Sequence, residues 1–570
     1  MEIEKVIKSL NINHDIETFE LSDVTKRVGN KLYYKNIPSA LLYLNHLSLF
    51  NEEIIDDGFK VKGTMIDLSR NAVFKLDYFK SVILRQALLG FNEIWLYLED
   101  VYELEDYVKF GYLRGKYTLK DIQELDTYAQ SVGVNLVPCI QTLGHMSQFL
   151  RWPSSYPFRD QADVLIISDE TYKFIQAMLD FCKEAFSTTK IHVGMDETFG
   201  FSFGQYYKQH GYTNPEDLFL NHLNQVYQKA KNTGFNEICI WSDMFFRHRS
   251  KTEYYYDTTI SFEDEFINKI PKDVTLVYWD YYNHKAEVYD LMIKNHQKMN
   301  RKVIMASGTW IWTKLAYDRE KTLKTATHAI NESLKNKVSE IIFTQWNDDG
   351  AYCDYETSFL GLVDVTNVMV GNQINPNYLS KINCYEQHKL EVVTKINQLG
   401  FDPIMLLWDD ILLGIYMNNL VGYNDSLIDP LIENANVVIK EIEAVNYPHF
   451  KNLLSYLKNK LELRKILLSG YFKTKNFDEA HNILKAARVN LMESLKSFEE
   501  NWLRRNKPFG LEVLQNRIYS QLRRLDMYEE IIKSYHDGYV IDFLEEKLSQ
   551  EPWLSVKYAD LSVSSKGSIV

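Results

Sequence analysis

Two adjacent carboxylates, Asp196 and Glu197, are the clearest sign of chemistry in this sequence. They follow residues 190–193, where the β-branched Ile191 and Val193 are typical of a buried strand. Neighbouring residues on a regular strand point to opposite faces, so both carboxylates can line one pocket only where the strand has ended. A carboxyl group placed beside a second one can hold and move a proton, as general acid–base catalysis requires. The pair therefore predicts an acid–base centre at the carboxyl end of a strand.

Tryptophan recurs at the ends of four successive strand-like runs later in the chain. These runs end at or lead to Trp241, Trp279, Trp310 and Trp346. A single tryptophan at a strand end is more often part of the core. Four in succession, the last followed by Asp348, favour a deep tryptophan-lined pocket that binds hydroxyl groups. Other acid pairs, such as Asp409-Asp410 and Asp169-Glu170, are expected to be solvated.

Apolar runs of strand length alternate with longer helical patterns from about residue 61 onward. The predicted strands are 63–68, 93–98, 135–140, 190–193, 237–241, 275–279, 302–306 and 340–344. Helical patterns between them include 76–89, 119–132, 170–185, 215–233 and 285–299. Eight β–α units predict an α/β fold, a closed (β/α)₈ TIM barrel over residues 61–370, with its active site at the carboxyl ends of the strands. An open doubly wound sheet is the alternative, but it usually has a glycine-rich phosphate loop, which is missing here.

The segments before and after the barrel differ from it. Residues 1–60 predict a small N-terminal α/β cap domain with a helix over 37–51. Residues 371–570 have no strand rhythm and predict a C-terminal helical domain. Its predicted helices are 384–399, 402–418, 429–445, 450–473, 477–501 and 511–535. The apolar stripe of 429–445 is amphipathic, so we expect this domain to pack on the barrel or to form a homodimer interface.

The composition excludes several classes of protein. A net charge of −13 over 570 residues argues against nucleic acid as the main partner. The five cysteines are scattered without a CxxC pair, which argues against a disulfide framework. The N-terminus lacks the apolar core of a signal peptide, and no run of about 18 apolar residues occurs. We therefore expect a cytoplasmic protein that does not act at a membrane.

Several motifs in these positions resemble those of glycoside hydrolase family 20, the β-N-acetylhexosaminidases. The similar motifs are His192-x-Gly194-x-Asp196-Glu197, Gly63-x-x-x-Asp67-x-Ser69-Arg70, Leu143-Gly144-His145 and Trp346-x-Asp348. The resemblance covers roughly residues 60–365 and is spread over most of the predicted strands. The chain is most similar to the small intracellular-type bacterial members, because it shares their N-terminal cap and C-terminal helical region.

The resemblance implies an exo-acting hydrolase that removes terminal β-linked N-acetylglucosamine or N-acetylgalactosamine with retention. In this family the 2-acetamido oxygen of the substrate is the nucleophile, and an oxazolinium intermediate forms. Glu197 would be the general acid and then the base, whereas Asp196 would bind the acetamido N–H and stabilise positive charge. The partners implied are oligosaccharides or glycoconjugates that end in N-acetylhexosamine. No cofactor and no metal is implied.

The resemblance also implies roles for residues around the pair. The tryptophans at positions 241, 279, 310 and 346 would enclose the acetamido methyl group and the sugar faces, and Asp348 would bind hydroxyl groups. His145 would support the catalytic pair. Tyr281 or Tyr282 would hold the acetamido oxygen, and the sequence does not choose between them.

Two positions depart from the family pattern. Lys62 stands where many members have an arginine that binds sugar hydroxyls, and an arginine fork is not replaced neutrally by lysine. Either Lys62 serves, or Arg70 reaches the pocket, or recognition at C4 is looser. Asp348 stands where glutamate is common. Both departures leave the choice between glucosamine and galactosamine configuration open.

Two other functions compete with this interpretation. In a metal-dependent barrel hydrolase, His145, His192, Asp196, Glu197 and Asp243 would be the ligands. The chain has no HxH or HExxH spacing, which argues against it. The second competitor is a glycan-binding protein without catalysis, against which the intact carboxylate pair weighs.

Overall fold

The computed structural model describes residues 2–47, 58–252, 254–371, 374–375, 379, 386–536, 540–547, 550 and 555–563. The chain divides into two compact units. The first comprises Met1–Trp310, Arg319–Trp346 and Gly361–Tyr385, and the second comprises Ile311–Asp318, Asn347–Leu360 and Glu386–Val570. The segment predicted as a separate N-terminal domain falls within the first unit. No helix in the described ranges is long and apolar enough to cross a membrane.

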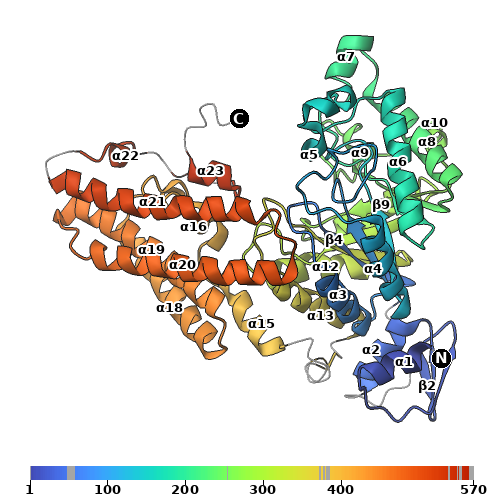
Figure 1. Cartoon of the computed structure of the whole chain (residues 1–570), viewed down its shortest axis with the longest axis horizontal. Helices are drawn as coiled ribbons and strands as arrows, with labels where there is room; N and C mark the ends of the chain where they lie inside the picture. The colour runs from blue at the N-terminus through green and yellow to red at the C-terminus, as the bar shows by residue number, and fades with distance from the viewer. Residues whose placement is uncertain are drawn as a thin grey trace. The chain divides into compact units, whose positions relative to one another are not determined.

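A closed barrel of eight parallel strands forms the centre of the first unit (Figure 1). The strands follow one another in chain order around the barrel, and the last pairs with the first. They are β4 (Val61–Asp67), β5 (Glu93–Tyr97), β6 (Asn135–Cys139), β7 (Lys190–His192), β8 (Glu237–Trp241), β9 (Val274–Trp279), β10 (Lys302–Gly308) and β11 (Glu340–Gln345). The predicted (β/α)₈ barrel is confirmed, and all eight strands lie where the periodicity placed them.

Helices lie between these strands and after the last of them. They are α3 (Leu76–Leu88), α4 (Leu119–Ser131), α5 (Ser147–Leu150), η1 (Pro153–Phe158), α6 (Asp169–Ala185), α7 (Gln205–His210), α8 (Pro215–Thr233), α9 (Asp243–Arg247), α10 (Asp264–Lys269), α11 (Ala286–Gln297), α12 (Arg319–Lys335) and α13 (Ser358–Val370). Local sequence fixes where several of them begin. Asn214 caps α8 by accepting from the Glu216 N–H at 2.9 Å, with Pro215 in the first turn.

The barrel interior separates an ionic end from an aromatic end. At the amino ends of the strands, the buried Lys190 Nζ lies 2.8 Å from Glu93 Oε1 and 3.0 Å from Glu340 Oε2. Above this cluster the interior is filled by apolar side chains, including Trp95 and Cys139. Trp241 belongs to the same core, so the barrel interior below the carboxyl ends of the strands is filled by side chains.

The N-terminal elements belong to the first unit. They are α1 (Glu2–Ser9), β1 (Thr18–Leu21), β2 (Lys26–Val28), β3 (Lys31–Tyr34) and α2 (Ile37–Leu47). The strands form a small mixed sheet in the order β1–β3–β2, with β1 parallel and β2 antiparallel to β3. The mixed α/β content predicted for this segment is therefore present. Residues 48–51 of the predicted helix lie outside the described ranges.

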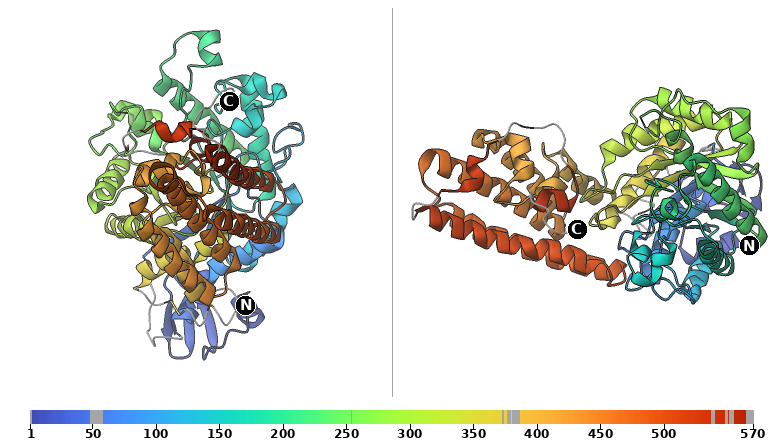
Figure 2. Two further views of the ribbon diagram at one scale, coloured as in Figure 1. Left: turned by 90° about the vertical axis from the view of Figure 1, so that its left-hand side faces the viewer. Right: turned by 90° about the horizontal axis from the view of Figure 1, so that it is seen from above.

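The second unit is helical in its described residues. Its elements are η2 (Tyr355–Thr357), α15 (Gln387–Thr394), η3 (Lys395–Gln398), α16 (Pro403–Trp408), α17 (Ile415–Val421), η4 (Asp425–Leu427), α18 (Asp429–Ala444), α19 (Pro448–Ser469), η5 (Gly470–Thr474), α20 (Ala480–Arg505), α21 (Leu511–His536), α22 (Asp542–Glu545) and α23 (Tyr558–Ser562). The long helices α18 to α21 pack against one another in chain order (Figures 1 and 2). The start of the predicted helix 384–399 lies outside the described residues.

The prediction of one continuous helix over 402–418 is wrong, because a turn separates α16 from α17. Gly414 lies in the left-handed region at φ +62°, which a helix interior does not allow. Asp409 accepts from two backbone N–H groups of α17, both at 3.0 Å, and Asp410 accepts from two N–H groups of the connecting turn. Both carboxylates are buried, so the expectation that this acid pair is solvated is also wrong. The other acid pair, Asp169-Glu170, is exposed as expected.

Candidate active site

The Asp196-Glu197 pair lies in a sharp turn directly after β7. Gly194 has φ +73°, and a Cβ atom there would stand 2.1 Å from Gln141 Oε1, so only glycine fits. Met195 and Glu197 also have positive φ, at 74° and 47°. Left-handed backbone in bulky residues is costly and is found mainly where a site requires it. The turn takes the chain out of strand geometry, as predicted, and so frees both carboxylates from the alternation of a strand.

Asp196 is the buried member of the pair. Gln141 Nε2 donates to its Oδ1 at 2.8 Å, and His145 Nε2 lies 3.2 Å from its Oδ2. Burial by itself raises the pKa of Asp196, but the charge of His145 at close range and the hydrogen bond from Gln141 lower that pKa below its ordinary value. Asp196 is therefore held as a carboxylate in one orientation.

His145 stands between the two carboxylates. Its Nε2 also lies 3.9 Å from Glu197 Oε2. Burial lowers the pKa of His145, but the neighbouring Asp196 more than reverses this and raises it to about 9. At neutral pH the imidazole is consequently a cation that stabilises negative charge on the pair. His145, which was predicted to support the pair, lies beside both carboxylates.

Glu197 is the accessible member of the pair. Its side chain is 37% exposed, whereas that of Asp196 is 11% exposed. Its Oε1 accepts from the Tyr255 hydroxyl at 3.5 Å, and its backbone N–H donates to Asp243 Oδ2 at 3.1 Å. The two adjacent carboxylates thus occupy unlike environments: Asp196 is fixed by neighbouring side chains, and Glu197 can reach a bound molecule.

Three residues at the site were not predicted as catalytic or substrate-binding. Gln141 orients Asp196, Tyr255 reaches Glu197, and Asp243 holds the backbone of Glu197. Asp243 begins α9 directly after β8, and its position at a strand end was the available signal in the sequence. Burial and the nearby charge of Asp196 raise the pKa of Asp243 to about 8. Tyr255 comes from a loop with no strand pattern, so no signal marked it.

Three of the four predicted tryptophans lie together at the carboxyl end of the barrel core. Trp241, Trp279 and Trp346 belong to or pack against the core cluster, and the Trp241 and Trp346 rings lie 6.3 Å apart. Trp310 instead contacts Tyr282 at 5.4 Å and carries the Lys321 ammonium 3.2 Å from its ring centroid. The structure therefore groups three tryptophans at the strand ends and places Trp310 against the start of α12.

The two tyrosines after β9 lie in different surroundings. Tyr281 is buried and stacks on Trp279, with ring centroids 5.4 Å apart and planes 17° apart. Tyr282 is 51% exposed and makes an edge contact with Trp310. Of the two predicted tyrosines, Tyr281 is the one that joins the tryptophan group.

Arg70 and Lys62 lie at opposite ends of β4. The Arg70 guanidinium is 5.4 Å from the Trp346 ring centroid and 3.4 Å from Glu99 Oε1. Lys62 is the second residue of β4, and its ammonium lies over the Phe91 ring at the amino end of the barrel. Five residues of strand span roughly 16 Å, which a lysine side chain does not bridge. Lys62 therefore lies away from the carboxylate pair, whereas Arg70 follows the carboxyl end of β4.

Two further predicted positions need separate mention. Asp348 falls in the second unit, so its role in binding sugar hydroxyls stays a prediction. His192, proposed as a ligand in the metal-dependent alternative, is buried, and burial lowers its pKa to about 3. Its Nδ1 accepts from the Gly194 N–H at 3.0 Å. Within the described residues, no three His, Cys, Asp or Glu side chains are arranged to hold a metal ion.

Two family models match separate parts of this chain. Residues 59–362 match the model of the glycosyl hydrolase family 20 catalytic domain, and residues 380–562 match that of the glycoside hydrolase 20C C-terminal domain. Hexosaminidase D from Bos taurus is 22% identical over 273 residues, which are 46% of this chain and 73% of that protein. Lacto-N-biosidase from Bifidobacterium bifidum is 29% identical over 157 residues, which are 24% of this chain but only 14% of that protein.

The chain also aligns with solved structures. A β-N-acetylhexosaminidase from Bacteroides fragilis aligns with a TM-score of 0.47 at 17% identity, covering 67% of this chain and 84% of that one. An exo-β-N-acetylglucosaminidase of the same hydrolase family from Vibrio harveyi, bound to N-acetylglucosamine, aligns with a TM-score of 0.46 at 13% identity, covering 67% and 70%.

Proposed function

Because the chain belongs to glycosyl hydrolase family 20, we propose that it is an exo-acting β-N-acetylhexosaminidase. It removes terminal β-linked N-acetylglucosamine or N-acetylgalactosamine from the non-reducing end of oligosaccharides or glycoconjugates. One observation carries this proposal: two adjacent carboxylates at the end of β7 stand in unlike environments, Asp196 buried and anchored and Glu197 accessible. A mechanism in which one carboxylate positions the substrate and the other transfers the proton needs this asymmetry.

Glu197 is the general acid and base of the proposed reaction. It gives its proton to the glycosidic oxygen while the bond from C1 to that oxygen breaks and the acetamido oxygen bonds to C1. An oxazolinium ring and a free aglycone alcohol result. The Glu197 carboxylate then takes a proton from water as that water attacks C1 and opens the ring. Two inversions at C1 give retention. The exposed carboxyl and its neighbour Tyr255 support this role.

Asp196 is the group that orients the acetamido nitrogen. An ionised carboxylate has about four lone-pair positions, so its contacts with Gln141 and His145 leave acceptor capacity for the acetamido N–H. The lowered pKa of Asp196 keeps it anionic, and an anion fixed beside C2 stabilises the positive charge of the oxazolinium ring. Such fixed charges cost no reorganisation during the reaction.

The tryptophan group is the proposed wall for the acetamido methyl group and the sugar. Trp241, Trp279 and Trp346 supply apolar ring surface at the strand ends. Tyr281 within this group and Tyr255 beside Glu197 are the tyrosines proposed to contact the acetamido oxygen. Arg70 supplies donors for sugar hydroxyls in place of Lys62. The role of Asp348 in binding hydroxyls remains part of the proposal.

The test compares aryl glycosides that share one leaving group and differ at C2. We expect the 2-acetamido substrate to be cleaved at least about a hundredfold faster than the 2-hydroxy substrate, because only the former supplies the nucleophile. A thiazoline analogue of the oxazoline should inhibit competitively. Equal rates for the two substrates would contradict the proposal.

Substitutions separate the roles of the two carboxylates. Glu197→Gln should slow substrates with poor leaving groups severely and activated aryl substrates much less, because only the former need protonation. Asp196→Asn should slow both kinds of substrate, by about 10²–10³, since ring formation accompanies bond breaking in each. Asp169→Asn and Glu170→Gln remove the same charges from an exposed acid pair and serve as matched controls. Equal effects of Glu197→Gln on both kinds of substrate would remove its role as acid.

A further inference from the structure

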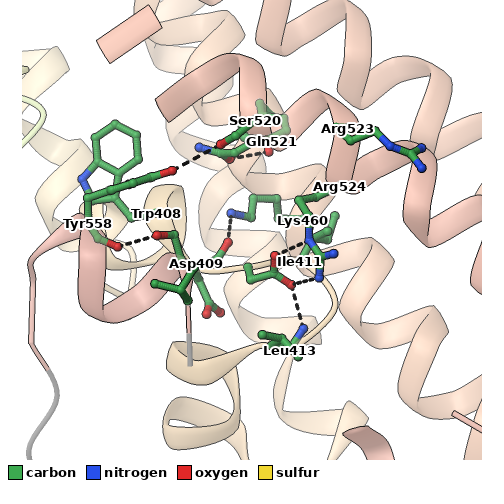
Figure 3. Close-up of a pocket in the computed structure, with 14 residues that line it drawn as sticks. Trp408, Asp409, Ile411, Leu413, Lys460, Ser520, Gln521, Arg523, Arg524 and Tyr558 are labelled. Atoms are coloured by element: carbon green, nitrogen blue, oxygen red, sulfur yellow. Dashed lines mark hydrogen bonds and ion pairs between the residues drawn. The ribbon is translucent and has the colours of Figure 1, made fainter. Parts of the chain in front are cut away.

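A cavity of about 470 Å³, partly open to solvent, is formed by residues of the second unit. It is lined by the end of α16 with the following turn, by α19 and α21, and by the segment from α23 to Val563 (Figure 3). All of its lining residues belong to the second unit, so it is a different cavity from the site at the barrel strands. A space of this size accommodates a small organic molecule.

A buried lysine forms part of the cavity wall. Lys460 is 3% exposed, and Figure 3 shows its side chain extending from α19 toward Asp409. Its ammonium donates to the backbone carbonyl oxygens of Leu407 at 3.0 Å and Asp409 at 2.6 Å. Both hydrogen-bond acceptors of Lys460 among the described residues are therefore neutral carbonyl oxygens, not carboxylates. An ammonium has three donors, so one remains besides these two carbonyls. The ammonium also lies 5.7 Å from the centroid of the Tyr456 ring, and both residues line the cavity.

The buried charges around Lys460 do not balance. Arg524 pairs with Asp410 at 2.5 and 2.8 Å, which neutralises both. Asp409, whose two oxygens accept backbone N–H groups, offsets one further cation. Lys460 and the buried Arg464, which donates to Leu412 O and Asn418, are therefore two cations against one carboxylate. One positive charge is left without a counter-charge among these groups, and an uncompensated buried charge is costly.

A second buried donor faces the same cavity. Gln521 is 8% exposed and lines the cavity beside Ser520. Its Oε1 accepts from the Tyr456 hydroxyl at 2.7 Å, whereas its Nε2 has no hydrogen-bond partner among the described residues. A buried amide N–H without an acceptor is unusual in a native protein and suggests a missing acceptor. The hydrogen-bonding groups of Lys460 and Gln521 that remain available to a ligand are both donors.

Apolar side chains form much of the remaining wall, which also includes Ser520, Ser562 and Arg523. Trp408, Ile411 and Val563 line the cavity, and the Tyr558 ring meets Trp408 edge to face at 5.4 Å. The complementary molecule therefore has acceptor oxygens and a negative charge at one end and an apolar body at the other. Burial lowers the pKa of Lys460 to about 8, although the charges of Asp409 and Asp410 oppose this shift.

We propose that this cavity is a binding site for a small organic anion whose carboxylate or phosphate oxygens are bound by Lys460 Nζ and Gln521 Nε2. The apolar body of the anion packs against Trp408 and Ile411. The site stands on the geometry of the helical unit alone and does not depend on the hydrolase reaction proposed above.

The experiment measures binding of three probes to the full chain by calorimetry. Benzoate and phenyl phosphate carry the two anionic groups on an aromatic ring, and benzyl alcohol is their neutral counterpart. We expect at least one anion to bind saturably and at least about tenfold more tightly than benzyl alcohol. The two anionic arms distinguish a carboxylate site from a phosphate site. Absence of saturable binding by both anions, or equal binding of benzyl alcohol, would overturn the proposal.

Lys460→Met tests the residue that carries the inference. It should weaken binding of the preferred anion at least about tenfold while aryl glycoside hydrolysis persists. Lys458→Met removes the same charge two residues earlier on α19, where the lysine pairs with Glu462 outside the cavity, and should leave binding unchanged. If Lys460→Met fails to fold, Gln521→Met replaces it with the same expectation. Unchanged binding in the folded variant would assign the anion to another place.

Discussion

Asp243 offers a sharp test of the electrostatics at the end of β8. The residue is 5% exposed, and its carboxyl accepts from the Glu197 N–H at 3.1 Å. Burial and the charge of Asp196 raise the pKa of this carboxyl to about 8. At about pH 6 the folded protein therefore holds a proton on Asp243 that an unfolded aspartate, with a pKa of about 3.9, has lost. Asp243→Asn replaces this neutral acid with a neutral amide of the same shape.

The size of the effect follows from the difference between the two pKa values. A rise of about four units corresponds to at most ~5 kcal/mol of stability that depends on pH. The folded state binds more protons than the unfolded state between these values. The contribution of Asp243 is therefore fully present below about pH 4 and is lost as pH rises to about 8. Since asparagine does not titrate, the stability of the native protein relative to Asp243→Asn should fall over this range.

Urea unfolding at about pH 5, 6, 7 and 8, followed by tryptophan fluorescence, measures this difference. Asp169→Asn, which alters an exposed aspartate, is the control and should show no such trend. Infrared difference spectra should also show a protonated acid carbonyl at about pH 6 that Asp243→Asn removes. A stability difference that does not change with pH, together with no such carbonyl band, would refute the reasoning.

Three further predictions concern the barrel. Lys190→Met leaves the buried Glu93 without its cation and Glu340 with Lys302 alone, so it should destabilise the protein by about 3–5 kcal/mol in urea unfolding. A loss below about 1 kcal/mol would show that Glu93 becomes protonated instead. Gly194→Ala places a Cβ 2.1 Å from Gln141 Oε1 at φ +73°, so turnover should fall by at least about tenfold, and unchanged kinetics would show that the turn adapts. His145→Gln removes a cation whose pKa is about 9. In the native protein this cation contributes stability that is fully present below about pH 6.5 and is lost as pH rises through about 9, so the variant should lack this pH dependence in urea unfolding. The same pH dependence of stability in both proteins would mean that His145 is neutral.

The sequence predicted the barrel because its signals are local. Eight apolar runs alternate with helical patterns, and helix starts such as Asn214-Pro215 need only neighbouring residues to form. The same locality placed Asp196 and Glu197 beyond a strand end. It failed for the predicted helix 402–418, where Asp409 and Asp410 compete for backbone N–H groups and the chain turns at Gly414.

Residues distant along the chain completed the site. Asp243 binds the backbone of a residue 46 positions away, and Gln141 orients one 55 positions away. No local pattern encodes such pairs. Lys62 and Arg70 are the opposite case: they are close in sequence but lie at opposite ends of the barrel, because β4 runs between them. A motif records which residues are near in sequence, but a barrel strand separates its two ends by its whole length.

The barrel, the carboxylate pair and the tryptophans at strand ends could be predicted from the residues alone, because periodicity and adjacency are properties of the chain. Three outcomes depend on how the chain packs: Asp196 is buried while Glu197 is accessible, Tyr281 stacks on Trp279 while Tyr282 does not, and Lys460 is buried in the helical unit. Burial decides these outcomes. How much water and charge surround a side chain depends on every element that packs around it.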